Sequence, residues 1–329
     1  AERPRTRVEG GAGPPPRPRT RVDQEALWGE RPDRRTRVDG AAPPPRARTR
    51  VDGTDGPTTE AAGGWTDGST LPPFLAARFT DVRPLPAGAQ AFVYRARDRG
   101  GDEVVVRVAR PGHQTTLNER TLEVVSASPH LVTVREVDEH DGVAYQVYDF
   151  VPGPTLAEHL RVTPRPPEAF VADFVAQMCD ALEVLGQAEL VHGDLQPQNV
   201  IVGGEGSQVA FVVIDFGLTR VARHTLVHGV AGGTPEYVPP EGFLGHQSRV
   251  WDWWSLGMIV AEMRLGRHPL AGAHPPSIGM TVALGRFELG DLADDERWSL
   301  LARGLLTRDH ERRWAAAQGS ARAWAAAST

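Results

Sequence analysis

The first 70 residues of this 329-residue chain contain four copies of an arginine-rich unit. The copies read RPRTRVEG, RPRTRVDQ, DRRTRVDG and RARTRVDG, at 3–10, 17–24, 33–40 and 46–53. Proline runs separate them, and large apolar side chains are scarce. Such a stretch cannot bury enough apolar surface to offset the entropy that is lost on ordering. We therefore expect residues 1–70 to be a disordered tail, so that a compact fold has to come from the rest of the chain.

The hydrophobic pattern changes at about residue 72, where short β-like runs begin to alternate with turn residues. We expect strands at 91–94, 103–109, 131–135 and 144–151, with one helix among them at about 114–126. Beyond residue 155 the apolar spacing is helical, and the expected helices cover 155–161, 167–187, 252–265, 297–306 and 315–326. The sequence thus predicts an α+β fold, in which a β-rich N-lobe (about 77–151) precedes a helical C-lobe (about 152–325). Ligands commonly bind in the cleft between two such lobes.

Composition narrows the choice of partners and location. The net charge of -6 argues against a nucleic-acid partner, because such proteins usually present a basic face. The single cysteine, Cys179, cannot form an internal disulfide, which fits a reducing cytoplasm. No apolar run reaches the ~20 residues that are needed to span a membrane. All 36 basic residues are arginine, so chemistry that ordinarily uses lysine must use another side chain here.

Two polar motifs carry the chemistry: VHGDLQPQNVIV at 191–202 and VVIDFGLTR at 212–220. Phosphoryl transfer from ATP needs a carboxylate beside the incoming hydroxyl and oxygen ligands that hold Mg²⁺ against the phosphates. The motifs resemble those of the eukaryotic-like (Hanks-type) Ser/Thr protein kinases of bacteria. This resemblance implies a two-lobed protein-kinase-like fold at 77–325, with ATP and Mg²⁺ as cofactors. It makes Asp194 the catalytic base and Asn199 and Asp215 the Mg²⁺ ligands.

Small-molecule phosphotransferases of the aminoglycoside-kinase type share the fold and a similar HGDLxPxN motif. Three downstream features favour a protein kinase. GTPEYVPPE at 233–241 resembles the segment that shapes the peptide-binding shelf. WDWWSLG at 251–257 resembles the helix whose Asp anchors the catalytic loop, and Arg313 matches the arginine that pairs with Glu241. A small-molecule phosphotransferase remains the minor alternative.

The N-lobe departs further from the family pattern. Alignment on Val93 places Pro86, Gly88 and Ala91 where the phosphate-binding loop has three glycines. Arg107 replaces the phosphate-contacting lysine, and its expected partner on the helix is Glu119, with Glu123 one turn later as a second candidate. The resemblance also places the adenine at the hinge, against the backbone of Asp149 and Val151, with Tyr148 at the back of the pocket.

These departures bear on activity. Besides Arg107, Gln196 replaces the lysine of the catalytic loop, and two loop glycines are lost. The base and both metal-ligand positions are intact. We therefore expect a Ser/Thr protein kinase of normal or weak activity, and a nucleotide-binding pseudokinase scaffold is the alternative. Gly193 replaces an arginine that ordinarily pairs with a phosphorylated activation loop, which argues against Thr219 or the candidate phosphosite Thr225 as the main switch.

Each tail repeat places an acidic residue three positions after a threonine, at Thr6, Thr20, Thr36 and Thr49. This spacing resembles the phosphothreonine motif that forkhead-associated domains bind through arginine clusters. We expect these threonines to be phosphosites that recruit a forkhead-associated-domain protein. The alternative is a basic linker that only tethers the kinase domain.

Overall fold

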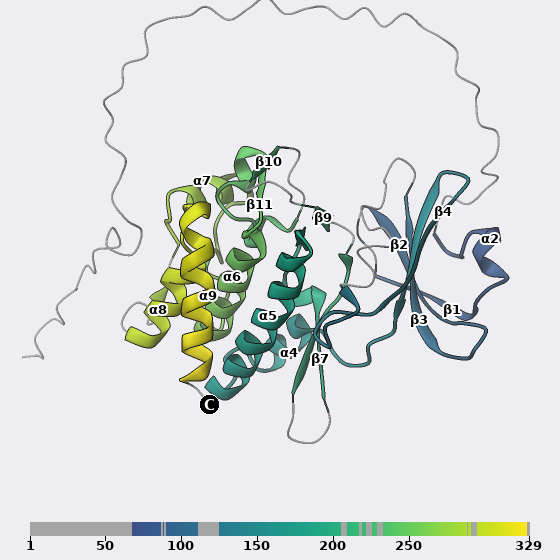
Figure 1. Cartoon of the computed structure of the whole chain (residues 1–329), viewed down its shortest axis with the longest axis horizontal. Helices are drawn as coiled ribbons and strands as arrows, with labels where there is room; N and C mark the ends of the chain where they lie inside the picture. Colours follow the sequence, from purple (N-terminus) through teal and green to yellow (C-terminus); the bar gives the residue numbers. More distant parts are fainter. Residues whose placement is uncertain are drawn as a thin grey trace, which may run out of the picture. The chain divides into compact units, whose positions relative to one another are not determined.

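The computed structural model describes residues 68–86, 88, 90–110, 125–204, 209–216, 219–221, 226–228, 233–287, 289–290 and 295–327. Strands β1 to β5 gather in the N-lobe, and helices α4 to α9 gather in the C-lobe (Figure 1). The predicted fold class, a β-rich lobe followed by a helical lobe, is confirmed. The tail repeats and the predicted helix at 114–126 lie outside the described residues, apart from 125 and 126.

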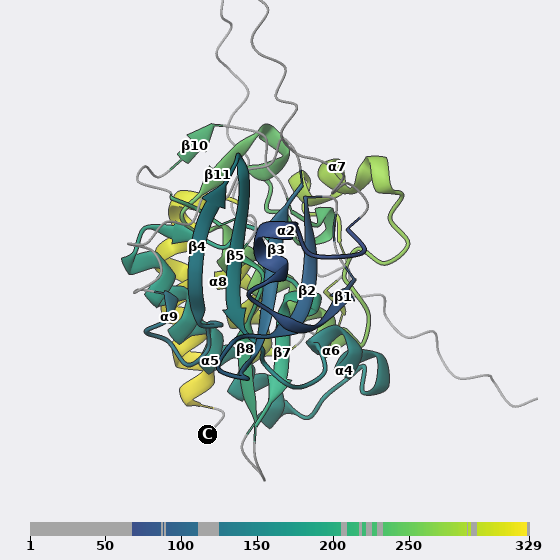
Figure 2. The same cartoon turned by 90° about the vertical axis from the view of Figure 1, so that its right-hand side faces the viewer.

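The N-lobe is a five-stranded antiparallel sheet in the order β1-β2-β3-β5-β4, which Figure 2 shows face on. Its strands are β1 (Thr80–Leu85), β2 (Ala91–Arg97), β3 (Glu103–Ala109), β4 (Val134–His140) and β5 (Val143–Asp149). Short turns join β2 to β3 and β4 to β5, and each of these two pairs forms an antiparallel hairpin, whereas β3 pairs with β5 instead of with β4.

Strand alternation divides this sheet into two faces. One face packs against Leu75 of the short helix α2 (Pro73–Ala76) and against Phe79 to form the buried core of the N-lobe. The strands β2, β3 and β5 contribute to this core Phe92, Tyr94, Ala96, Val104, Val106, Val108, Tyr145 and Val147. The intervening residues point to the opposite face. There Val93, Arg107 and Gln146 lie side by side across three strands, because Arg107 pairs with each of the other two.

The C-lobe is built around a helix that is buried on nearly all sides. This helix, α6 (Trp251–Leu265), packs between α5 (Glu168–Gln187) and α8 (Glu296–Leu305), and α9 (His310–Ala326) crosses both α5 and α8. Its sequence, WDWWSLGMIVAEMRL, has no polar face, as expected of a helix with neighbours all round. Two shorter helices, α4 (Leu156–Val162) and α7 (Ile278–Ala283), complete the lobe among the residues described.

Short elements between α5 and α6 position the site. Strand β6 (Leu190–Val191) leads into a loop that ends in the 3₁₀ helix η1 (Pro197–Asn199), and the hairpin of β7 (Val200–Gly203) and β8 (Ala210–Val213) follows. Strand β9 (Arg220–Val221) pairs with β6, and β10 (Leu226–His228) pairs with β11 (His246–Ser248). The 3₁₀ helices η3 (Pro235–Tyr237), η4 (Gly242–Leu244) and η5 (Pro275–Ser277) lie farther along the chain.

The expected strand at 131–135 is displaced in the structure. Strand β4 begins only at Val134, while Leu131 forms an isolated parallel bridge with Val213 of β8, and the Val132 N–H donates to the Val213 carbonyl over 2.9 Å. The apolar run LVTV therefore serves a contact between the lobes before it joins the sheet. Strand β1 and helix α7 were not predicted, and α9 begins at His310 rather than at 315.

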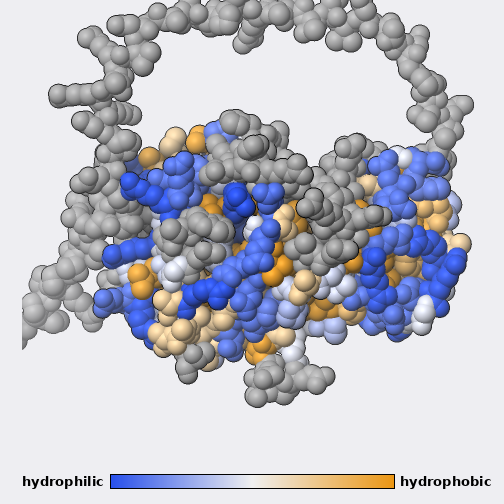
Figure 3. Space-filling model, viewed as in Figure 1, coloured by the Kyte–Doolittle hydropathy of each residue, from blue (hydrophilic) through white to orange (hydrophobic). Residues whose placement is uncertain are grey.

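Hydrophilic side chains cover much of the described surface on the face in Figure 3, with apolar residues exposed between them. The most exposed large apolar side chains are Val162, Leu244, Met280 and Leu300, at 51–79%. Scattered residues of this kind are common on protein surfaces. Within the described part of the chain, no helix combines the length and apolar character that a membrane crossing requires.

Candidate active site

A buried carboxylate holds the loop that follows β6. Asp252, in the first turn of α6, accepts the backbone N–H of His192 over 2.8 Å and that of Gly193 over 2.9 Å. Burial raises the pKa of Asp252, and the two N–H bonds oppose this effect by stabilising the charged form. The expectation that this Asp anchors the catalytic loop is confirmed.

His192 ties the same loop to the second motif. Its Nε2 donates to the Ile214 carbonyl over 3.0 Å, while its Nδ1 accepts the Asp194 N–H over 3.3 Å. The ring meets Phe216 edge to face, with centroids 5.2 Å apart. These contacts bring residues 192–194 and 214–216 together although some 20 residues separate them in sequence.

Four donors surround the Asp194 carboxylate. Gln196 Nε2 and Asn199 Nδ2 donate to Oδ2 over 3.0 and 3.1 Å, and both the N–H and the Oγ1 of Thr234 lie within 2.9–3.1 Å of Oδ1. Gln196, which stands at the usual lysine position, thus contacts the predicted base directly. Thr234 was not predicted as a site residue. Its only signal in the sequence is its place in GTPEYVPPE.

Glycine is required where these two segments cross. Gly193 has φ = 81° and Gly233 has φ = 110°, backbone conformations that side chains rarely allow. A Cβ on Gly233 would lie 2.8 Å from the Gly193 carbonyl oxygen and 3.7 Å from Oδ1 of Asp194. The absence of side chains lets Thr234 reach the carboxylate.

The two predicted metal ligands lie on adjacent segments. The Ile214 N–H donates to the Asn199 carbonyl over 2.8 Å, so Asp215 follows directly beside Asn199. Asn199 Nδ2 donates to both the carbonyl and the carboxylate of Asp194, which turns the amide so that Oδ1 is the atom that a metal can use. Asp215 has φ = 62° and a half-exposed carboxylate, although Phe216 beside it is fully buried. A non-glycine residue in this region is strained, and such strain clusters at functional sites.

The donor set fits Mg²⁺. This ion prefers oxygen ligands and is commonly held by one or two carboxylates together with substrate phosphates. Asp215 offers one carboxylate and Asn199 offers one amide oxygen, which agrees with this ligand preference. Among the described residues no group of three or more His, Cys, Asp or Glu side chains forms a metal cage, so the remaining ligands would come from water and phosphate.

Arg107 reaches this region from the N-lobe. Its Nε lies 3.2 Å from Oδ1 of Asp215, and its Nη1 donates to Oε1 of Gln146 over 3.5 Å. The Tyr148 hydroxyl donates to the same Gln146 oxygen over 2.6 Å. Glu119 and Glu123 lie outside the described residues, so the pair of Arg107 with a helix glutamate stays a prediction.

Of the other predicted nucleotide contacts, two share the sheet face of Arg107 and two lie in a connection between strands. Ala91 and Val93 of β2 share its face of the sheet, and Val93 is its direct cross-strand neighbour. Pro86 and Gly88 lie in the connection from β1 to β2. Tyr148 is buried near the end of β5, two residues beyond Gln146 and on the same face.

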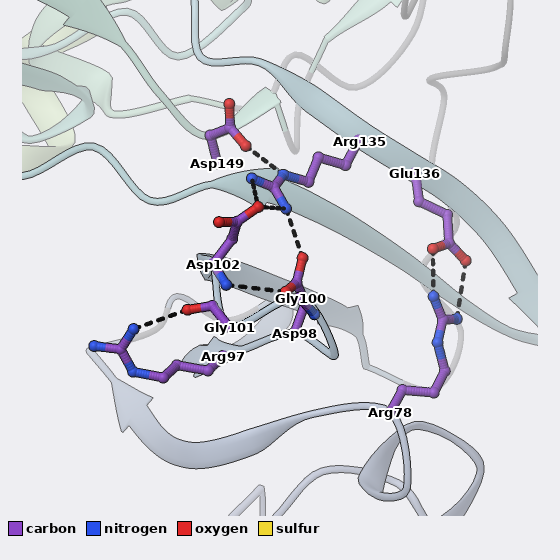
Figure 4. Close-up of polar contacts among 9 residues, drawn as sticks. All are labelled: Arg78, Arg97, Asp98, Gly100, Gly101, Asp102, Arg135, Glu136 and Asp149. Atoms are coloured by element: carbon purple, nitrogen blue, oxygen red, sulfur yellow. Dashed lines mark hydrogen bonds and ion pairs between the residues drawn. The ribbon is translucent and has the colours of Figure 1, made fainter.

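The hinge begins at Asp149, which Arg135 of β4 holds in place (Figure 4). The Arg135 guanidinium also binds Asp98 over 2.7 Å and Asp102 over 3.3 Å, both in the turn between β2 and β3. The hydrogen bond to Asp149 raises the pKa of Arg135. The Asp149 N–H donates to the Thr133 carbonyl over 3.0 Å, so the carbonyl of Asp149 is the backbone group that would meet a nucleotide. Val151 follows two residues later.

A cavity of about 470 Å³ opens beside the hydrogen-bond partners of Asp194, the predicted base. Its walls include Gln196 and Thr234, both partners of Asp194, and two acidic residues, Glu236 and Glu262. Burial raises the pKa of Glu262, and the Tyr237 hydroxyl donates to its Oε2 over 2.7 Å, which opposes that rise.

The segment that forms one wall of this cavity is fixed from α9. Arg313, fully buried, donates to both carboxylate oxygens of Glu241, over 2.8 and 3.0 Å. Ser248 donates to the same carboxylate over 2.5 Å. The predicted pairing of Arg313 with Glu241 is confirmed. Of the phosphosites considered, Thr219 is fully buried, while Thr225 and the tail threonines lie outside the described residues.

Comparison with known proteins agrees with this geometry. A family model described as protein kinase domain matches residues 79–325. Protein kinase 2 of Dictyostelium discoideum is 30% identical over 244 residues, which is 71% of this chain and 50% of that kinase. Serine/threonine-protein kinase PkaA of Streptomyces coelicolor is 32% identical over 57% of this chain and 39% of its own. The cAMP-dependent protein kinase catalytic subunit 3 of Drosophila melanogaster is 28% identical over 64% and 35%.

The chain therefore spans half or less of the length of these curated relatives. The family match, in contrast, extends from Phe79 in the N-lobe to the last helix, α9, and includes every site segment described above. By its sequence and by the arrangement of its two lobes, the chain belongs to the protein kinase family.

Proposed function

We propose that the protein is an ATP-dependent serine/threonine protein kinase. The observation that carries this proposal is the Asp194 carboxylate, held by the catalytic loop on one side and by Thr234 on the other. It lies at the edge of the cavity lined by Thr234 and Gln196. A hydroxyl of a substrate bound there would meet a fixed carboxylate. The Streptomyces relative supports a bacterial member of the family.

In this proposal each residue has a definite task. Asp194 orients the substrate hydroxyl and accepts its proton, and the four donors around it fix the direction of its oxygen atoms. Asn199 Oδ1 and Asp215 would hold Mg²⁺, and Arg107 would lie against the phosphates. Mg·ATP supplies the phosphoryl group and the positive charge that offsets its oxygens. The backbone at Asp149 and Val151 and the side chain of Val93 would position the adenine.

The cavity favours a protein substrate over a small molecule. It is an open depression between α4, the catalytic loop and the segment 234–237, and its lining has two carboxylates, Glu236 and Glu262, against one arginine, Arg161. Such a surface suits a peptide with arginine near the accepting hydroxyl. The four tail threonines have arginine on both sides, so the sequence RPRTRVDQ is a fitting test peptide. Binding of the phosphorylated tail by a forkhead-associated domain, and a cytoplasmic location, remain proposals from the sequence.

Transfer of ³²P from labelled ATP and Mg²⁺ to RPRTRVDQ tests the proposed activity. Asp194→Asn is expected to lower kcat by about 10²- to 10⁴-fold, the usual contribution of a general base. Asp215→Asn is expected to lose turnover through the metal, and the exposed Asp173→Asn on α5 serves as a matched control that retains it. ATP binding without transfer in the unmodified protein would indicate the pseudokinase alternative.

One variant, assayed with two peptides, tests the acidic lining. Glu262→Gln is expected to raise KM for RPRTRVDQ with little change in kcat, because the charge that meets arginine is lost. The same variant should not alter KM for a peptide in which the two arginines beside threonine are replaced by alanine. Equal effects on both peptides would assign Glu262 a structural role only.

A further inference from the structure

Gln146 is an unusual residue for its place in the sheet. It lies in the middle of β5, in the run AYQVY, and only 1% of its surface is exposed. A buried amide destabilises a fold unless it is hydrogen-bonded. Its neighbours Tyr145 and Val147 point into the N-lobe core, whereas Gln146 points to the opposite face, where Arg107 lies.

Gln146 is the acceptor, through Oε1, in its side-chain hydrogen bonds with Tyr148 and Arg107. The Tyr148 hydroxyl, buried to 3% exposure, donates to Oε1 over 2.6 Å. Burial raises the pKa of Tyr148 far above its ordinary value, so the hydroxyl stays protonated and remains a donor. This bond fixes which end of the amide carries the oxygen. The same Oε1 faces Nη1 of Arg107 over 3.5 Å.

Arg107 is thereby held at two points of its planar fork. Nε lies 3.2 Å from Asp215 in the C-lobe, and Nη1 contacts Gln146 in the N-lobe sheet. Two fixed points define the plane of a guanidinium. Its five N–H groups lie in that plane; Nη1 gives one of them to Gln146, while Nε makes an ion pair with Asp215. The orientation of this plane also sets the directions in which the remaining N–H groups point.

We propose that Gln146, oriented by Tyr148, is the positioning residue that allows arginine to act at the phosphate-contacting position of this kinase. The proposal rests on the proposed function. Lysine offers one compact ammonium at the end of a flexible stem, and it needs no second anchor to set a plane. Arginine does need one, because a rotated fork would direct its N–H groups away from the phosphates. Gln146 and Arg107 therefore form one functional unit.

The expected consequence is coupling between the two positions. In the natural protein, Gln146→Met, which keeps the side-chain length and removes the acceptor, should weaken Mg·ATP binding and lower kcat/KM by about tenfold, as for one hydrogen bond to a charged group. Arg107→Lys should also weaken both. In the Arg107→Lys background the further change Gln146→Met should have little effect, because the lysine does not use the amide.

Four full-length proteins make the test: the natural chain, the two single variants and the double variant. The readouts are the Kd for Mg·ATP by calorimetry, kcat and KM for RPRTRVDQ, and the unfolding midpoint without nucleotide. Tyr148→Phe is the second probe, should Gln146→Met fold poorly. It removes the orienting hydroxyl and keeps the ring, and it should weaken ATP binding with arginine at 107 but not with lysine there.

The outcomes separate the two proposals. A tenfold effect of Gln146→Met on Kd that shrinks to less than about twofold in the lysine background supports the inference. Equal factors in both backgrounds, with a matching loss of unfolding midpoint, overturn it and leave Gln146 as a structural residue. Failure of the natural protein to transfer phosphate while the coupling in Kd persists contradicts the proposed function alone.

Discussion

His268 shows how burial of a single ring can couple stability to pH. Its ring lies edge to face against Tyr237, with centroids 4.9 Å apart, and its Nδ1 accepts the Leu270 N–H over 3.1 Å. Its Nε2 is buried and has no hydrogen-bond partner among the described residues. Burial lowers the pKa of His268 to about 4. The folded protein therefore resists a protonation that the unfolded chain accepts near pH 6.5.

The direction of the pH effect follows from this difference. Above pH 6.5 the ring is neutral in both states, and its contribution to stability is complete. Between pH 6.5 and 4 only the unfolded chain takes up the proton. The free energy of unfolding therefore decreases as the pH is lowered through this range. We predict that His268→Asn, whose Oδ1 can accept the Leu270 N–H, will lose less stability on acidification than the natural protein. The difference in the pH-dependent loss of unfolding free energy should be up to about 3 kcal/mol.

Urea denaturation at several pH values between 7.5 and 4.5 would measure the effect of His268→Asn. The exposed His274→Asn is the matched control and should keep the pH profile of the natural protein. If the His268→Asn profile ran parallel to that of the natural protein, the burial of this ring would have no bearing on acid stability.

Some residues of the candidate site could be predicted from the sequence alone and others could not. Asp194, Asn199 and Asp215 could be singled out because the two motifs that contain them resemble those of protein kinases, whose chemistry needs these residue types. Thr234 and Gln146 could not, because their partners lie 40 and 39 residues away and only the fold brings them together. The polar residue inside the run AYQVY was the one available signal for Gln146.

At the scale of elements, two of the ion pairs that α9 forms differ strongly in burial. Arg313 near its start is fully buried with Glu241, whereas Arg322 near its end is half exposed and pairs with Glu183 of α5. Removal of one partner from a buried pair leaves an uncompensated charge, at a cost of about 3–5 kcal/mol. An exposed pair contributes less than about 1 kcal/mol.

We therefore predict that Arg313→Met destabilises the protein by about 3–5 kcal/mol, and that Arg322→Met on the same helix costs less than about 1 kcal/mol. Urea denaturation at pH 7.5 measures both. The double change Arg313→Met with Glu241→Met should recover part of the loss, because no buried charge remains. A similar cost for both single variants would contradict the assigned difference in burial.

Helices and strands were easiest to predict where all the apolar residues of a segment pack within the same part of the fold. The helices α5 and α6 match the expected 167–187 and 252–265 within a residue. A long segment whose apolar residues recur at helical spacing indicates a helix and nothing else. Strand β1 was missed because it lies at the sheet edge, and its residues TDVRPL are mostly exposed and include a proline. The run at 131–135 was shifted because its first residues contact β8 instead of the sheet.

At the scale of the whole molecule, the two lobes meet through backbone and charge together. Val213 of β8 exchanges hydrogen bonds with the backbone of His130 and Val132, each over 2.9 Å, and Arg107 reaches Asp215 a few residues later. The first contact needs no particular side chain. The second depends on arginine at 107, in a chain that has no lysine anywhere.

The absence of lysine gives a prediction about the whole chain that does not need turnover. An ATP analogue whose γ-phosphate carries an acyl group transfers that group to a nearby amine, which forms an amide and releases ATP. A protonated guanidinium does not react in this way, because it stays charged at all ordinary pH values. We expect the natural protein to bind the analogue but to gain no acyl group in the nucleotide site.

Arg107→Lys should create the missing target. We predict acylation at position 107, found by mass spectrometry after proteolysis and suppressed by an excess of ATP, because the new amine lies beside the phosphates. The matched control is Arg99→Lys in the exposed turn between β2 and β3, where any labelling should be slow and indifferent to ATP. Equal labelling of both variants, or labelling at 107 that ATP does not suppress, would remove Arg107 from the phosphate site and with it the proposed role of the sheet face that it shares with Val93 and Gln146.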